Sequence, residues 1–429
     1  MQKQALEVPD VEIHVSRVQV AGLIRTKNDI VVEHIKDVLQ ASSLKELFVK
    51  ALTSMEQLQD MKVFKNVSLK IDTDKRAGLE REGVEVTFLV QELGWLKAML
   101  GAHAGTQSGD ASLSLALRNI FGRAEQLEVT SGTSFPLWGH NVQLQFTKPY
   151  YKNFDKKLLL SLGTTDTKLP MCGYDELLRS GSVELQTPSW LGSHKLSWEV
   201  DWREITGFSY NAPLSVRANA GHSLKSSLKH TLVTDERDDP LLPHSGYQVK
   251  MTHEMAGLGG DTVYGKAEVQ SELYQELWRD WVLSLRVWGG LMRPFTQSKI
   301  NDRFLLGGAT SLRGFGLWGA GPRDQGYSLG GEAYWATGLH LFSPLPFTRN
   351  QFLQRIRVHT FATAGNLIQC RTVPSPRDLA SGTRVSCGVG LHFRLGLAQI
   401  ELNYAIPIRA QATDQIQPGL QFGIGLDML

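Results

Sequence analysis

One arginine stands alone in a glycine-rich segment late in the chain. The segment 307–316 reads Gly-Gly-Ala-Thr-Ser-Leu-Arg-Gly-Phe-Gly, and Arg313 carries its only charge. Solvated loop tips usually carry several charges, whereas a guanidinium enclosed by glycine and phenylalanine needs an acceptor for its planar fork of donors. Glycines permit the close backbone approach that a folded-in loop requires. The predicted loop residues are Gly307, Gly308, Leu312, Arg313, Gly314 and Phe315.

A second segment, residues 260–267, nearly matches a phosphate-binding P-loop. That motif ends on a serine or threonine that holds magnesium, and Ala267 occupies the position here. The following stretch, Val269–Leu277, fits a strand as well as a helix, so the required helix N-terminus is not assured. We therefore interpret 260–267 as a hairpin turn.

Enzyme and metal chemistry find no supporting pattern. The twelve histidines show no metal-ligand spacing, and three scattered cysteines are too few for a zinc site or a disulfide framework. A Gly-x-Ser-x-Gly elbow is missing, and the acidic run 235–239 lacks the spacing and the glycine of a calcium loop. We expect no enzymatic activity, no metal and no cofactor.

Residues 11–92 have the pattern of a small α+β domain. Thr26–Asp29 and Ser43–Glu46 resemble capping boxes, each opening a helix. The predicted strands are Val15–Val20, Val67–Ile71 and Val84–Val90, which gives the order β-α-α-β-β. The apolar faces at helical spacing are Ile30, Val31, His34, Ile35, Val38 and Leu39, then Leu47, Phe48, Ala51, Leu52, Met55 and Leu58.

From about Leu93 onward the hydrophobic period changes to two. The clearest case is 196–203, where Leu, Trp, Val and Trp alternate with Ser, Glu, Asp and Arg. Strands of roughly ten residues suit a tilted crossing of a hydrocarbon layer, and charges such as Asp201 and Arg203 on the polar face suit an aqueous lumen. About 335 residues at roughly 21 per strand and connection give on the order of 16 strands. We predict that residues 93–429 form a transmembrane barrel of about 16 antiparallel strands.

Composition sets further bounds. The 429 residues include 45 basic and 43 acidic ones, a balance that does not favour nucleic acid as a partner. The first ten residues, predicted as a tail, resemble neither a secretory signal nor a matrix presequence. A soluble β-sandwich or propeller also alternates, because its outer face meets water. Extraction by alkaline carbonate separates that alternative from an integral barrel.

One β-α-α-β-β domain before a barrel of this size, with a late Leu-Arg-Gly-Phe segment, resembles the outer-membrane insertases. The first domain is similar to their polypeptide-transport-associated (POTRA) domain. Within the family, the single POTRA domain resembles the mitochondrial sorting-and-assembly-machinery core subunit. The segments that carry the resemblance, which runs from about Val11 to Leu429, are 119–125, 221–228, 235–247, 302–315 and 330–336.

The resemblance implies a core insertase that folds and inserts β-barrel proteins into the mitochondrial outer membrane, with its POTRA domain facing the intermembrane space. The implied partners are unfolded β-barrel precursors, metaxin-type accessory subunits, the lipid bilayer and, further, a cristae-organising complex. A passive outer-membrane channel or porin is the alternative. It would need neither the POTRA domain nor the lid loop, which the resemblance places near 302–325.

The acceptor for Arg313 cannot be carried over from the family. In bacterial members the lid arginine meets two lumenal acids, and the corresponding positions here are His340 and Thr363, neither of which is acidic. Glu332 is a further candidate contact, and an ordinary lumenal or turn charge explains it equally well.

The family opens between its first and last strands, which here would be about Leu93–Ala104 and Gln417–Leu429. A client strand pairs with the exposed edges by β-augmentation. The last strand resembles the signal at the end of barrel clients, and an ordinary lipid-facing strand explains the same residues. They are Gln421, Gly423, Leu426 and Met428.

Overall fold

A computed structural model describes most of the chain. The described residues are 11–73, 83–105, 109–135, 139–150, 153–240, 242–278, 280–309, 311–345, 356–370, 372–395 and 398–427. The predicted tail 1–10 and Met428 lie outside them. Two compact units divide the chain: the first holds the N-terminal domain with Leu115–Glu128 and Phe146–Leu158, and the second holds the rest of the barrel.

The N-terminal domain has the predicted β-α-α-β-β order. Its three-stranded sheet has the order β1-β3-β2, in which β1 is parallel and β2 antiparallel to β3. The helices follow β1 in sequence, with a short 3₁₀ turn between them. The bounds are β1 His14–Ala21, α1 Asn28–Ile35, η1 Lys36–Gln40, α2 Leu44–Asp60, β2 Phe64–Thr73 and β3 Gly83–Glu92.

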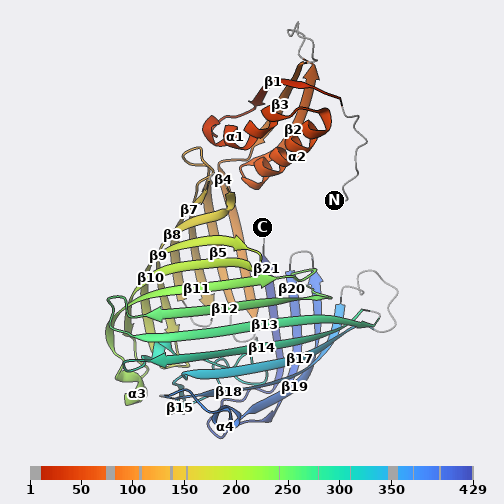
Figure 1. The fold of residues 1–429 in the computed structure, drawn as a ribbon. Helices are drawn as coiled ribbons and strands as arrows, with labels where there is room; N and C mark the ends of the chain where they lie inside the picture. The colour runs from red at the N-terminus through yellow and green to blue at the C-terminus, as the bar shows by residue number, and fades with distance from the viewer. Residues whose placement is uncertain are drawn as a thin grey trace. The chain divides into compact units, whose positions relative to one another are not determined.

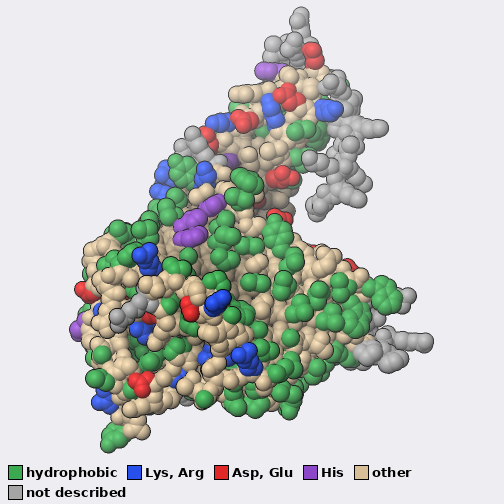
Figure 2. Space-filling view, turned by 60° about the horizontal axis from the view of Figure 1, so that its bottom comes forward, with side chains coloured by type: hydrophobic (Ala, Val, Ile, Leu, Met, Phe, Trp, Pro, Cys, Tyr) green, Lys and Arg blue, Asp and Glu red, His purple; other side chains and the backbone are tan. Residues whose placement is uncertain are grey.

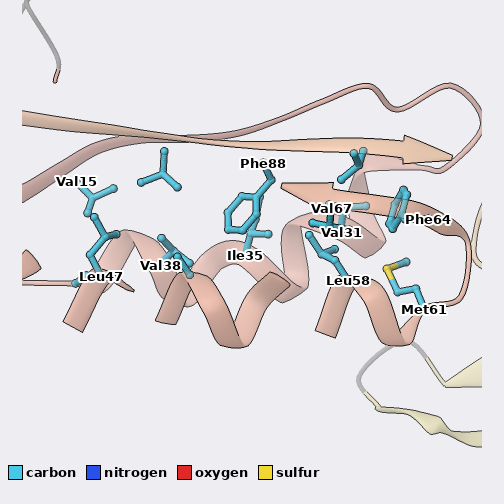
Figure 3. Packing of buried hydrophobic residues seen from close by; sticks show 14 of the residues in the cluster. Val15, Val31, Ile35, Val38, Leu47, Leu58, Met61, Phe64, Val67 and Phe88 are labelled. Carbon is cyan, nitrogen blue, oxygen red and sulfur yellow. The ribbon is translucent and has the colours of Figure 1, made fainter. Parts of the chain in front are cut away.

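The core of this domain lies between the sheet and the two helices (Figure 3). Leu47 and Leu58 of α2 and Phe88 of β3 are fully buried there. Each lies on the inward face that the side-chain period of its helix or strand defines. The predicted helical faces are confirmed for most positions. They are wrong for Leu39 and Leu52, which are exposed.

The two predicted capping boxes have different outcomes. Ser43 does cap α2, since its side chain accepts from the Glu46 backbone N–H. Thr26 does not cap α1, which begins at Asn28 without any side-chain cap. The Thr26 hydroxyl instead accepts a hydrogen bond from the Asn119 amide at 2.9 Å. A tertiary contact has therefore replaced the local one.

Within the first unit, Glu92 ties the end of β3 to the segment before α1. Its carboxylate accepts from the backbone N–H groups of Ile24, Arg25 and Thr26 at 2.9–3.2 Å. Partial burial raises the pKa of Glu92, but the hydrogen bonds from these residues outweigh it and hold the pKa below its ordinary value. The carboxylate is thus ionised at neutral pH.

Sixteen strands form a closed antiparallel barrel, as predicted (Figure 1). The strand expected over Leu93–Ala104 is β4, and the last strand is β21. Neighbours in sequence pair with each other, and β21 closes the barrel against β4. The strands are β4 Leu96–Gly105, β5 Gly109–Arg118, β6 Gln126–Phe135, β7 Gly139–Tyr150, β8 Asn153–Leu169, β9 Tyr174–Ser189, β10 Gly192–Thr206, β11 Gly221–Asp235, β12 Gly246–Ala256, β13 Tyr264–Trp278, β14 Trp281–Pro294, β17 Ala333–Pro344, β18 Ile356–Ile368, β19 Arg384–Leu395, β20 Ala398–Arg409 and β21 Gly419–Asp427.

The apolar faces of the barrel strands point outward. In β10, Leu196 and Trp198 are 45% and 50% exposed, whereas Ser197 and Arg203 on the alternate face are 5% and 4% exposed. Hydrophobic side chains are accordingly spread over the visible face of the barrel (Figure 2). From Ser197 to Arg203 the side chains of β10 that face the interior are polar, which is the arrangement of a transmembrane barrel and the reverse of a β-sandwich.

The remaining elements lie in the connections. They are α3 Leu214–Arg217, η2 Ile300–Asp302, β15 Arg323–Asp324, β16 Tyr327–Ser328 and α4 Pro376–Ala380. In the part of the chain that the structure describes, no helix has the length and apolar character to cross a membrane. The P-loop-like segment 260–267 is the turn between β12 and β13 and the start of β13, as interpreted from the sequence.

Candidate functional site: the lid and the last hairpin

The long connection between β14 and β17 is the loop predicted as a lid. Leu312 and Phe315 are completely buried, and they pack with Leu306, Ala320 and Leu367. Gly307 adopts φ +114°, and a Cβ atom there would lie 2.8 Å from the carbonyl oxygen of Gly316. This position therefore requires glycine, both for its backbone conformation and for its close approach to the returning chain.

Arg313 finds its acceptor on the penultimate strand. Its Nη2 lies 3.3 Å from Oε2 of Glu401 on β20, and the guanidinium lies 5.1 Å from the ring centre of Phe361. The Arg313 side chain is 5% exposed, so this single ion pair is formed with little solvent around the arginine. Its Nε has no hydrogen-bond acceptor among the described residues.

The two positions inferred from the family lie close to Arg313 without pairing with it. His340 and Thr363 line a small cavity together with Arg313 and Arg286. Thr363 shares a hydrogen bond of 2.7 Å with Ser386 instead. The acid that pairs with Arg313 is therefore on β20, not at either of these two positions. Glu401 also lies 3.6 Å from Nε2 of His392.

Sequence reasoning missed Glu401 although a signal for it existed. Ile400, Leu402 and Tyr404 alternate as the apolar face of this strand. Glu401 therefore belongs to the inward face by the same period of two that predicted the barrel. A search for any acid on an inward face, rather than for an acid at the family positions, would have included it.

Glu332 forms an ion pair with Arg303, a different arginine of the lid. Its carboxylate lies 3.1 Å from Nε of Arg303 and accepts hydrogen bonds from the Ser298 hydroxyl and the Cys370 backbone N–H. Glu332 thus contacts the lid through Arg303, and it is not the acceptor for Arg313. Near the start of the lid, Asp302 forms a second buried ion pair with Arg203 of β10, with 2.6 Å between Oδ1 and Nη1.

The tip of the lid pairs with the connection that leads to the last strand. Backbone hydrogen bonds of 2.8 Å join Gly316 N–H to the Gln415 carbonyl, Gln415 N–H to the Gly319 carbonyl, and Gln417 N–H to the Gly314 carbonyl. Asp414 reinforces this pairing, since it accepts from the Gly321 backbone N–H and from the Arg384 guanidinium. The lid therefore contacts both β20 and the β20–β21 connection.

The last strand presents its predicted residues on defined sides. Gln421 points inward and is 1% exposed, and neither atom of its amide has a hydrogen-bond partner in the described part of the chain. Phe422 points outward. Gly423 and Leu426 pair in register with Gly105 and Ala102 of β4.

A 16-stranded barrel with a buried lid and one preceding POTRA-like domain defines an outer-membrane barrel of the insertase type. Residues 119–428 match the Omp85 superfamily domain. The chain belongs to the Omp85 superfamily, and within it to the branch of the sorting and assembly machinery component 50 homologues. It is accordingly a protein of the mitochondrial outer membrane and not an enzyme.

Several relatives extend over nearly the whole chain. The sorting and assembly machinery component 50 homolog A of Xenopus laevis is 39% identical and covers 100% of this chain and 93% of its own length. The human homolog is 39% identical, with 97% and 91% covered. The SAM50-like protein CG7639 of Drosophila melanogaster is 30% identical, with 99% and 96% covered.

Solved structures share the fold. BamA from Haemophilus ducreyi lacking POTRA domains 1–3 is similar with a TM-score of 0.83 at 18% identity, covering 97% of this chain and 85% of that one. CdiB from Acinetobacter baumannii is similar with a TM-score of 0.57 at 12% identity, covering 97% and 74%.

Proposed function

We propose that this protein inserts β-barrel precursors into the mitochondrial outer membrane through the seam between β4 and β21. Unfolded β-barrel precursors are its substrates in this proposal. The N-terminal domain faces the intermembrane space. Metaxin-type subunits and a cristae-organising complex are its proposed protein partners.

The observation that carries the proposal is which two strands form the seam. The barrel closes by pairing its first strand, β4, with its last strand, β21, and the described pairs run from Gly423 with Gly105 to Asp427 with Gly101. These two strands are not consecutive in the chain, so no short connection ties one directly to the other. When they separate, each exposed edge offers free backbone groups to a client strand.

The lid supports a role for this seam because it contacts the last hairpin, whose second strand, β21, forms one side of the seam. Arg313 pairs with Glu401 on β20, and the lid backbone pairs with residues 415–417 just before β21. Movement of the last hairpin therefore requires these contacts to be broken or carried along. We propose that the lid sets the resting position of the hairpin.

The last strand supplies the residues that we propose for client exchange. Gln421, Gly423, Leu426 and Met428 form the pattern that a client's final strand would imitate. The Gln421 amide is buried without a partner in the described part of the chain, which is costly for a polar group and rare in finished folds. A client strand could satisfy that amide when it takes the place of β21.

A reversible disulfide across the seam tests the proposal. Ala102→Cys with Leu426→Cys places two cysteines at paired positions of β4 and β21. Val249→Cys with Ser271→Cys is the matched control, at paired positions of β12 and β13. Oxidation of the seam pair should block assembly of an imported barrel precursor, and reduction should restore it. Insertion that continues with the seam closed would refute the proposal.

The same variants address the porin alternative. A passive channel conducts ions through its lumen and has no use for the seam. Closure of the seam would then leave planar-bilayer conductance and precursor assembly both unchanged. An insertase loses precursor assembly when the seam is closed, whatever its conductance.

A further inference from the structure

The outer wall formed by β9–β12 carries polar side chains at two levels. On β10 the outward positions run from His194 to Glu204, with Leu196, Trp198 and Val200 between. Ten residues at about 3.3 Å each, tilted by roughly 40°, span about 25 Å along the barrel axis. That is about the height of the apolar band of an outer-membrane barrel. The separation of the two levels therefore matches the height of an apolar band between two headgroup layers.

At the Glu204 level, three neighbouring strands contribute one cluster. The Arg179 guanidinium of β9 lies 4.6 Å from the ring centre of Trp202, and the His222 ring of β11 is stacked on the same indole at 5.4 Å. His222 Nε2 lies 3.9 Å from a carboxylate oxygen of Glu204. The strand register sets Trp202 opposite Arg179 and Glu204 opposite His222, so the fold itself fixes the cluster.

Arg179 is a charged side chain on the outward face of the barrel, where most side chains are apolar. Arg179 is exposed on the lipid-facing side of the barrel and has no ion pair within the described parts of the chain. A cation on this side is expensive at the bilayer centre and inexpensive at the headgroup level, where phosphate is available. Trp202 beside it has the amphipathic ring that belongs at the membrane interface.

We infer that Arg179, Trp202, Glu204 and His222 form a binding site for one phospholipid with an ammonium-bearing headgroup. Arg179 binds the phosphate by charge-assisted hydrogen bonds, and Glu204, two residues further along the strand from Trp202, binds the ammonium group. Trp202 lies beneath the glycerol region, and Leu224, exposed on β11, flanks the acyl chains. The site is independent of the proposed seam, because it lies on other strands.

Native mass spectrometry of the full chain, released from detergent with added lipid, tests this site. The probes are dioleoyl phosphatidylethanolamine, dioleoyl phosphatidylglycerol, which lacks the ammonium group, and dioleoylglycerol, which lacks the phosphate. The expected order of retention is the order in which these lipids are given. Arg179→Gln should lower retention of the ethanolamine lipid by roughly tenfold, the loss of about one charge-assisted hydrogen bond.

Two further variants sharpen the test. Glu204→Gln should reduce retention of phosphatidylethanolamine to the level of phosphatidylglycerol, and retention of phosphatidylglycerol itself should stay unchanged. Lys195→Gln removes a cation from the inward face of β10 and should change the retention of neither phospholipid. Each variant is first checked for the mobility of a folded barrel on an unheated gel. Equal retention of all three lipids, wild-type retention by Arg179→Gln, or equal losses in Lys195→Gln would overturn the site.

Discussion

The N-terminal domain and the barrel bury opposite kinds of side chain. In the first, Leu47, Val86 and Phe88 are inside and fully covered. In the second, leucines and tryptophans such as Leu196 and Trp198 face outward, and Asp201 and Arg203 are inside. Both regions obey the same hydrophobic effect, since each places apolar surface where water is excluded. For the barrel, that place is the lipid.

The difference also determines what holds each region together. Packing stabilises the N-terminal domain, whereas the barrel depends on ladder hydrogen bonds and on paired charges within its lumen. A buried pair such as Arg203–Asp302 is costly to break because the remaining charge stays buried without its ion-pair partner. The comparison therefore predicts different sensitivities to substitution in the two regions.

The largest expected effect is on the lumenal ion pair. Arg203→Ala leaves the Asp302 carboxylate, 3% exposed, without its guanidinium. We expect a loss of about 3–5 kcal/mol in the free energy of unfolding, measured by guanidinium titration in detergent. Arg203→Lys keeps the charge and should lose less. An Arg203→Ala barrel as stable as the wild type would show that the lumen is solvated enough to need no pairing.

In the N-terminal domain, truncation of a packed leucine should matter most. Leu47→Ala removes a fully buried side chain and should lower the free energy of opening by about 2–5 kcal/mol. Hydrogen exchange of peptides from β3 provides the measurement. Leu52→Ala on the same helix is the control, because that side chain is exposed and its loss should have little effect.

A charge on the outer wall tests whether that wall faces lipid. Leu228 lies outward at the middle of β11, and Leu228→Lys should destabilise the reconstituted barrel by about 2–4 kcal/mol. Thr187→Lys, near the end of β9, should cost only about 0–1 kcal/mol, because the interface is close. Equal costs at both positions would contradict a lipid-facing wall.

The smallest effect is expected from pH on the N-terminal domain. The pKa of Glu92 is lower in the folded than in the unfolded state, so its contribution to stability is complete above the unfolded pKa, about 4.3. It is lost as the pH falls through the folded value. Hydrogen exchange of β3 should therefore lose protection below about pH 4, and Glu92→Gln should flatten that profile. Glu56→Gln, on an exposed residue of α2, should leave the profile unchanged.

Local periodicity explains what could be predicted from the sequence. The alternation at 196–203 and the helical spacing at Leu47–Leu58 each depend on residues close in the chain, and the strand and the helix that they predict are confirmed. Pairings between distant residues could not be read in this way. Arg313 and Glu401 are 88 positions apart, and only the closed barrel brings them together.

The expectation for Thr26 was wrong for a physical reason. Thr26 has the residue type of a helix cap, but the Asn119 amide competes for its hydroxyl. Glu332, a candidate contact of the lid, pairs with Arg303 and not with Arg313. In neither case does the neighbouring sequence identify the partner.

Reversal of the Arg313–Glu401 pair tests the central claim most directly, namely that the lid holds the hairpin beside the seam. Arg313→Glu and Glu401→Arg would each slow precursor assembly in isolated mitochondria, since each places like charges together. The double variant should regain much of the wild-type rate, with a coupling of about 0.5–3 kcal/mol. If the double variant assembles precursors no faster than the product of the two single defects predicts, the lid does not act through Glu401.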